Sequence, residues 1–184
     1  MTKIETKYGQ KVLVIDKTDL DETNAYVGDI DVTQEFDGGI EIAADLGWVR
    51  FSAAIRAKLY IVAKAGTGIK AGEGIEAGEG IKAGWGIEAG TGIKAGEGIK
   101  AGTGIKAGWG IEAGWGIKAG EGIKAGLSIT AKWISTRLRI FAGLCIWKQP
   151  APEETEIRAE LRGGTVSFGT LVEPKEPNTE TEAA

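Results

Sequence analysis

Two short patterns in this chain have the residue types of known chemical sites. The first is G-x-G-x-x-A, which reads GTGIKA at residues 66–71 and recurs in the later copies of the same phrase. It is a variant of the dinucleotide-binding fingerprint, which works where a glycine turn joins a strand to a helix that holds the phosphates. No helical pattern follows any copy, so we interpret it as a product of periodicity and not as a nucleotide site.

The second pattern is the acidic run DKTDLDETN at residues 16–24, which offers the oxygen ligands that calcium prefers. Aligned from Asp19, an EF-hand loop would need Gly at position 24 and Glu at position 30. The chain has Asn24 and Ile30 there. We therefore predict a solvated acidic loop instead of a calcium site.

The chain offers few groups for nucleophilic or metal chemistry. Its only cysteine, Cys145 in FAGLCIW, has no acid–base partner nearby, and we predict a buried structural thiol. There is no histidine, which is the usual general base and a common zinc ligand. We expect no catalytic residues, no metal site and no cofactor, and hence a protein that is not an enzyme.

The strongest binding signal is a set of tryptophans that recur among lysines: Trp85, Trp109 and Trp115, with Lys82, Lys100 and Lys118. One interpretation is structural, because aromatic rings can cover lysine stems and stabilise a surface by packing and cation–π contacts. The other is functional, because outward tryptophans on a rigid scaffold are typical anchors of binding interfaces. The sequence alone supports both interpretations.

These residues belong to a repeat, A-G-x-G-I-z, in which x is Thr, Glu or Trp and z is Lys or Glu. A period of six fits β structure and not the 3.6-residue period of a helix. We place a strand at I-z-A and a corner at G-x-G, where glycine permits unusual backbone angles. Stacked coil on coil, the strands form a β-solenoid whose core is lined by Ile69, Ile75, Ile81, Ile87, Ile93, Ile99, Ile105, Ile111, Ile117 and Ile123.

The charges at z indicate how many faces each coil has. Stacked side chains lie roughly 4.8 Å apart, so like charges in one column repel. Two faces would give five like and three opposite neighbours between residues 70 and 124, whereas three faces give three like and four opposite. A three-sided coil of about 18 residues is therefore favoured.

Beyond the regular phrase at 65–127, degenerate copies extend the predicted solenoid to residues 49–148, with Ile134, Ile140 and Ile146 continuing the core. Residues 1–48 read as an acidic N-terminal capping region, and residues 149–172 as a C-terminal hairpin cap that turns at Gly163-Gly164. Residues 173–184 read as a disordered tail. The net charges of residues 1–48, 49–148 and 149–184 are −7, +8 and −5, from 4 basic and 11 acidic, 15 and 7, and 3 and 8 residues.

The repeat resembles the left-handed β-helix hexapeptide class in having an aliphatic residue at every sixth position. A-G-x-G-I-z followed by LSITAKWISTRLRIFAGLCIW looks more like repeat-bearing hypothetical proteins of gut bacteria and their phages or mobile elements, over roughly residues 55–148. Acyltransferases of the hexapeptide class have a small inward residue two places before the aliphatic one. Here that place is x, so a bulky x predicts an outward corner.

The resemblance implies a binding protein, most concretely an inhibitor of bacterial host defence of the anti-CRISPR kind that blocks a nuclease or its nucleic-acid binding. The expected partner is a protein. The alternatives are a structural component of a phage particle or filament, with self-association through the solenoid ends or faces, and a nucleic-acid-binding solenoid. No segment reads as a signal peptide or a membrane span, and a lone cysteine suits a reducing compartment, so we expect a cytoplasmic location.

Overall fold

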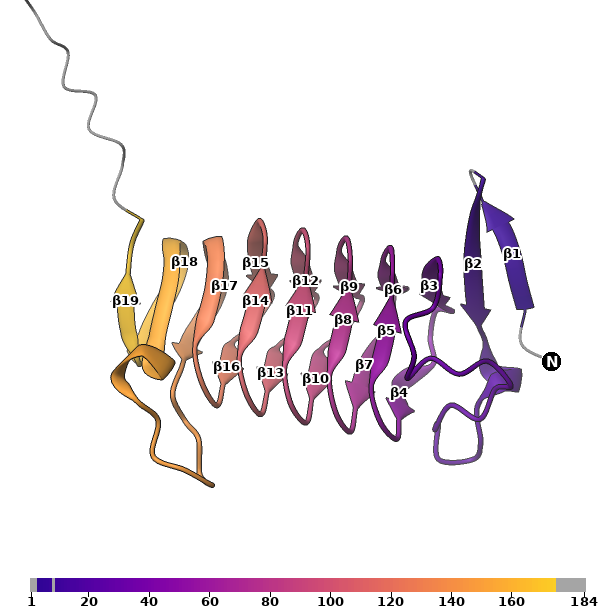
Figure 1. Cartoon of the computed structure of the whole chain (residues 1–184), viewed down its shortest axis with the longest axis horizontal. Helices are drawn as coiled ribbons and strands as arrows, with labels where there is room; N and C mark the ends of the chain where they lie inside the picture. The colour runs from indigo at the N-terminus through magenta and orange to yellow at the C-terminus, as the bar shows by residue number, and fades with distance from the viewer. Residues whose placement is uncertain (1–2, 8, 175–184) are drawn as a thin grey trace, which may run out of the picture.

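The computed structural model describes residues 3–7 and 9–174 and shows a three-sided parallel β-solenoid of about 7 turns (Figure 1). Equivalent strands lie roughly 18 residues apart, as the charge pattern predicted. No α-helix occurs in the described part of the chain, and none of its segments is a helix that could cross a membrane.

Each face of the solenoid is a stack of short parallel strands, one per coil. Face 1 contains β4 (Gly47–Phe51), β7 (Thr67–Ala71), β10 (Ile87–Ala89), β13 (Ile105–Ala107) and β16 (Ile123–Ala125). Face 2 contains β5 (Ile55–Ala57), β8 (Ile75–Ala77), β11 (Ile93–Ala95) and β14 (Ile111–Ala113). Face 3 contains β3 (Gly39–Ile42), β6 (Ile61–Ala63), β9 (Ile81–Ala83), β12 (Ile99–Ala101) and β15 (Gly116–Ala119).

The core is a thin column of isoleucine and alanine. The isoleucines of the regular coils are 0–1% exposed, and the alanine two residues later is also buried. The z side chains point outward and form the predicted columns, in which Lys70 pairs with Glu88 at 2.9 Å and Lys94 with Glu112 at 3.6 Å. Both pairs are exposed, so each contributes only about 0.5 kcal/mol.

The corner glycines are required for a different reason from the one that the repeat suggested. None of the glycines from Gly72 to Gly126 has a φ in the left-handed region, so unusual backbone angles are not their role. A Cβ on the first glycine of a regular corner would instead lie about 2 Å from a backbone oxygen of the preceding coil, such as 1.9 Å from the Gly78 oxygen at Gly96. Close packing of successive coils therefore requires glycine.

The solenoid begins earlier than residue 49. Strand β1 (Lys3–Lys7) pairs antiparallel with β2 (Gln10–Ile15), and β2 runs parallel to β3 at the end of face 3. The segment between β2 and β3 contains a short 3-10 turn, η1 (Lys17–Asp19), and bridges Ala25 to Arg50 and Phe36 to Ala57. The predicted N-terminal capping region is therefore largely an irregular first coil.

The C-terminal end also differs from the prediction. Strand β17 (Ile129–Phe141) bends across all three faces, with Ile129, Ile134 and Ile140 stacked on Ile111, Ile117 and Ile123. Ile146, expected to continue this column, is 98% exposed. The chain leaves the coil after Phe141 and returns through a 3-10 turn, η2 (Pro152–Thr155).

The hairpin predicted at residues 149–172 is wrong. Strand β18 (Glu156–Phe168) runs parallel to β17 as a further coil, and β19 (Thr170–Val172) runs parallel to the start of β18. Gly163-Gly164 is a corner and not a reversal. A parallel coil satisfies the edge of β17 on all three faces, which a hairpin could not do. Of the predicted tail at residues 173–184, residues 175–184 lie outside the described part of the chain.

Candidate binding surface

The structure places the three predicted tryptophans on three different corners. Trp85 lies between faces 3 and 1, Trp109 between faces 1 and 2, and Trp115 between faces 2 and 3, as their backbone bonds to Thr67, Thr91 and Glu97 show. They are 43%, 49% and 60% exposed, so the prediction of outward corners is confirmed. Because each points in its own direction, they do not form one binding surface.

Each corner tryptophan has its own surroundings. The Nζ of Lys132 lies 4.2 Å from the ring centroid of Trp115, a cation–π contact that stabilises this ring in place. The ring of Trp109 lies 6.0 Å from that of Trp147, tilted by 51°. Trp115 therefore fits the structural interpretation, whereas Trp109 belongs to a larger aromatic group.

We call Trp109, Ile146 and Trp147 the corner cluster. Trp147 is 55% exposed and Ile146 almost wholly so. The loop that carries them is fixed at its base, where the Gly143 amide donates to the Leu127 carbonyl at 3.0 Å and the Ala142 amide to the Phe168 carbonyl at 3.0 Å. Lys148 and Glu154 form an ion pair within the loop. The cluster thus combines a corner tryptophan with two exposed apolar side chains on a loop whose first residues are hydrogen-bonded to the scaffold.

The predicted lysine column does exist on face 3. Lys82, Lys100 and Lys118 are in register on β9, β12 and β15. They line an open groove of about 550 Å³ that Glu79, Glu97 and Trp115 also line. The carboxylates offset the lysine charge, so this column is not a continuous basic stripe.

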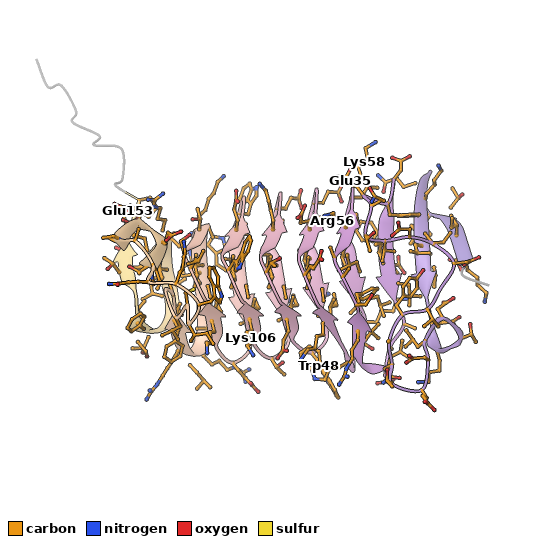
Figure 2. All side chains as sticks on the ribbon, turned by 60° about the horizontal axis from the view of Figure 1, so that its bottom comes forward. Glu35, Trp48, Arg56, Lys58, Lys106 and Glu153 are labelled. Atoms are coloured by element: carbon orange, nitrogen blue, oxygen red, sulfur yellow. The ribbon has the colours of Figure 1, made fainter. Side chains whose placement is uncertain are left out.

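The floor of this groove on face 3 is a column of glycines that ends at the ring of Trp133. Trp133 stands where a regular coil has its second corner glycine and lies over Gly116, whose added Cβ would be 2.1 Å from the indole. Trp48, which is labelled in Figure 2, occupies the same position on face 1. Its ring covers Gly68 and Gly86. Neither ring was predicted to be part of a surface from the sequence, although each directly precedes a core aliphatic residue, where the repeat has glycine.

The best-organised ionic group lies near the N-terminal end. The Glu41 carboxylate accepts from Lys7 Nζ at 2.9 Å and lies 3.4 Å from Lys64 Nζ, and these hydrogen bonds hold its pKa below the ordinary value. Burial and the same carboxylate raise the pKa of Tyr60, whose hydroxyl donates to Glu41 at 3.4 Å. The four groups satisfy one another and tie β1 to face 3.

In the acidic segment 16–24, the aspartate side chains accept hydrogen bonds from backbone amides of the same segment and its next residue. The Asp16 carboxylate accepts from Thr18 at 2.8 Å, which lowers its pKa, and the Asp21 carboxylate accepts from Thr23 and Ala25 amides. Asp19 is buried and caps the same turn. No cluster of three metal-binding side chains occurs among the described residues. Cys145 is half-buried and free, and not fully buried as predicted.

Comparisons of the chain with protein-family models, with curated protein sequences and with solved structures find no match.

Proposed function

We propose that this chain is a non-enzymatic binding protein that presents a rigid solenoid to a protein partner and contacts it through the corner cluster. The observation that carries the proposal is the exposure of Ile146 and Trp147 beside Trp109. Exposed apolar side chains gathered in this way, with two indole rings in contact and an exposed isoleucine next to one of them in the chain, are costly in water and typical of interaction sites. Tryptophan is also among the residues that dominate binding energy.

The scaffold favours binding because it already holds the contact residues in place, so few of them have to become ordered when a partner binds. Face 1, face 2 and the loop base are hydrogen-bonded coil to coil, so the position of Trp109 is set before any partner arrives. A preorganised anchor loses less conformational entropy on association. Lys106 precedes the Trp109 corner and Lys124 lies one coil further, which favours a partner with an apolar pocket and an acidic rim.

The specific partner class comes from the resemblance to proteins of gut bacteria and their phages. An inhibitor of a host defence nuclease, acting in the bacterial cytoplasm, is the most concrete form of the proposal. Such an inhibitor acts by occupying a surface and needs no catalytic residues. The acidic first and last segments of the chain suit a basic nucleic-acid groove, and the basic middle suits an acidic partner surface.

The experiment is a comparison of matched variants in partner capture. The full chain is immobilised, proteins retained from a bacterial host lysate are identified by mass spectrometry, and each is purified and titrated. Trp109→Ala with Trp147→Ala should weaken true partner binding by about 2 kcal/mol, whereas Trp85→Ala with Trp115→Ala should change it little. For the inhibitor form, the purified chain should reduce the activity of a bound nuclease.

Two outcomes would refute the proposal. The first is that every captured protein binds the Trp109 and Trp147 variant as tightly as the unmodified chain. The second is that no host protein is retained at all and every tested defence nuclease is unaffected. Circular dichroism of both double variants checks that any loss of binding is not a loss of fold.

A further inference from the structure

The β17 coil replaces the two corner glycines of face 1 with arginines. Ile140 pairs with Ile123, and the Leu138 amide donates to the Glu121 carbonyl at 3.0 Å, so TRLRIF at residues 136–141 occupies the positions of A-G-x-G-I-z. Arg137 and Arg139 therefore stand where the regular coils have glycine, and Phe141 stands in the z column above Lys124.

These substitutions surround an open hollow of about 880 Å³ at the C-terminal end of face 1. We call it the cationic hollow, and its chemically distinctive lining residues are Lys124, Arg137, Arg139, Phe141, Thr165 and Ser167. No carboxylate lines it, unlike the groove of face 3 with Glu79 and Glu97. Its polar lining thus consists of cations and hydroxyl groups.

Among the described residues, no carboxylate forms an ion pair with the cations of the cationic hollow. No ion pair joins Lys124, Arg137 or Arg139 to a described carboxylate, although Lys70 and Lys94 elsewhere on the solenoid each have a glutamate partner. Three cations grouped without counter-charge repel one another and create a positive potential. An anionic ligand would relieve that repulsion.

The surroundings favour phosphate groups attached to an aromatic base. Arginine forms paired hydrogen bonds with phosphate oxygens, and the hydroxyls of Thr165 and Ser167 can donate to phosphate or sugar. Phe141 is half-buried beside the cations, with Phe168 as its register partner on β18. A cationic groove that carries aromatic side chains is the general arrangement for binding single strands.

The length of the basic run limits the ligand. Lys106, which is labelled in Figure 2, lies one coil from Lys124 in the same column. Glu88 follows it in that column, so the cationic run spans about three coils. At roughly 4.8 Å per coil this is 10–15 Å, enough for a few nucleotides. A duplex stacks its bases on one another and offers no free base to Phe141, so a single strand fits better.

We propose that the cationic hollow binds a short stretch of single-stranded nucleic acid, with phosphates on Arg137, Arg139 and Lys124 and a base against Phe141. This goes beyond the proposed function, because the ligand is a nucleic acid and the distinctive residues of the site, Arg137, Arg139 and Phe141, belong to the β17 coil and not to the corner cluster. The site needs no covalent chemistry and no metal.

The test is fluorescence anisotropy of a labelled oligothymidylate of about ten nucleotides with the full chain, at about 50 mM and about 200 mM salt. Arg137→Gln with Arg139→Gln should weaken binding at least about tenfold, because two charge-assisted contacts are lost. Phe141→Leu should weaken it about fivefold through lost stacking. Lys82→Gln with Lys100→Gln removes the same charge from face 3 and should change the affinity less than about threefold.

Several results would overturn the proposal. One is the absence of any anisotropy change at the lower salt concentration. Another is equal weakening by the two double variants, which would show attraction by net charge and not by a site. Equal affinity for a duplex of the same length, or no effect of Phe141→Leu, would reject the single strand in favour of a general polyanion. Circular dichroism confirms that each variant is folded.

Discussion

The two glycines of each corner meet different neighbours, and this separates their roles. A Cβ on Gly96, the first glycine of its corner, would lie 1.9 Å from the Gly78 oxygen, whereas a Cβ on Gly98, the second, would lie 3.3 Å from the Gly116 oxygen. The first contact involves backbone on both sides and cannot be relieved by a side-chain rotation. The second glycine position accepts Trp48, Trp133 and Arg139 in the irregular coils. In the irregular β17 coil the first position also carries a side chain, that of Arg137, whereas every regular coil has glycine there.

Gly96→Ala should therefore be far more damaging than Gly98→Ala. Forcing two coils apart is an overpacking cost, and we expect about 3 kcal/mol for Gly96→Ala. Gly98→Ala should stay within about 1 kcal/mol of the unmodified chain, because the small clash is offset by a less flexible unfolded chain. Thermal unfolding followed by circular dichroism measures both. Equal destabilisation by the two changes would contradict this account of the corner.

At the scale of elements, the regular strands could be predicted from the sequence and the irregular ends could not. Period, strand placement, coil length and charge columns all follow from constant letters repeated ten times. Strand β18 has no such support, because its core residues Ile157, Leu161 and Val166 are unevenly spaced and Gly163-Gly164 is also a common hairpin signal. Ile146 continues the six-residue spacing in the sequence, but it lies outside the coil, because β17 ends at Phe141 and the chain leaves the solenoid there.

The candidate surface could also be predicted only where the repeat is regular. The corner positions of Trp85, Trp109 and Trp115 follow from x, because the regular register fixes them. The contact of Trp109 with Trp147 depends on the path of the loop after β17, which no periodicity determines. Arg137 and Arg139 were visible as departures from glycine, but their meaning required the register of Ile140 on Ile123.

Glu41 joins three elements and makes their docking dependent on pH. Its carboxylate is held by Lys7 of β1 and by Lys64 just after β6, and these hydrogen bonds lower its pKa from the ordinary value of 4.5. A lowered folded-state pKa means that the stabilisation is full above the unfolded-state pKa and is lost as the pH falls through the folded-state pKa. The N-terminal hairpin should therefore loosen on acidification below pH 4.5.

Glu41→Gln tests this dependence. The variant should be less stable than the unmodified chain at neutral pH, and the difference should shrink as the pH falls below the ordinary pKa of the carboxylate. Hydrogen exchange of the β1 and β2 amides, measured across this pH range, follows the loosening directly. Asp37→Asn, which removes an exposed pair with Lys58, is the control and should show a smaller effect. A constant difference at all pH values would exclude Glu41 as the titrating group.

At the scale of the whole molecule, the regular coils are interchangeable units between two irregular ends. Each coil contacts its neighbours through the same isoleucine, alanine and glycine positions, so stability is a sum over adjacent coils. Deleting residues 85–102 removes one coil and brings Thr103 onto Thr67 in the same corner column, with every core residue still in register. The irregular end coils are not interchangeable in this way. The pairing of β17 with β18 contains register shifts that the regular coils do not have.

The shortened chain should therefore fold, with its long axis reduced by roughly 4.8 Å and a modestly lower melting temperature. Small-angle scattering gives the length, and circular dichroism gives the strand content. Deleting the same number of residues at 129–146 removes the β17 coil and leaves β18, with its uneven spacing, to stack on regular hexapeptides, which it does not match. That deletion should unfold the C-terminal end and be degraded readily by protease. If both deletions behave alike, the coils are not independent units, and the sum of neighbour contacts does not describe this solenoid.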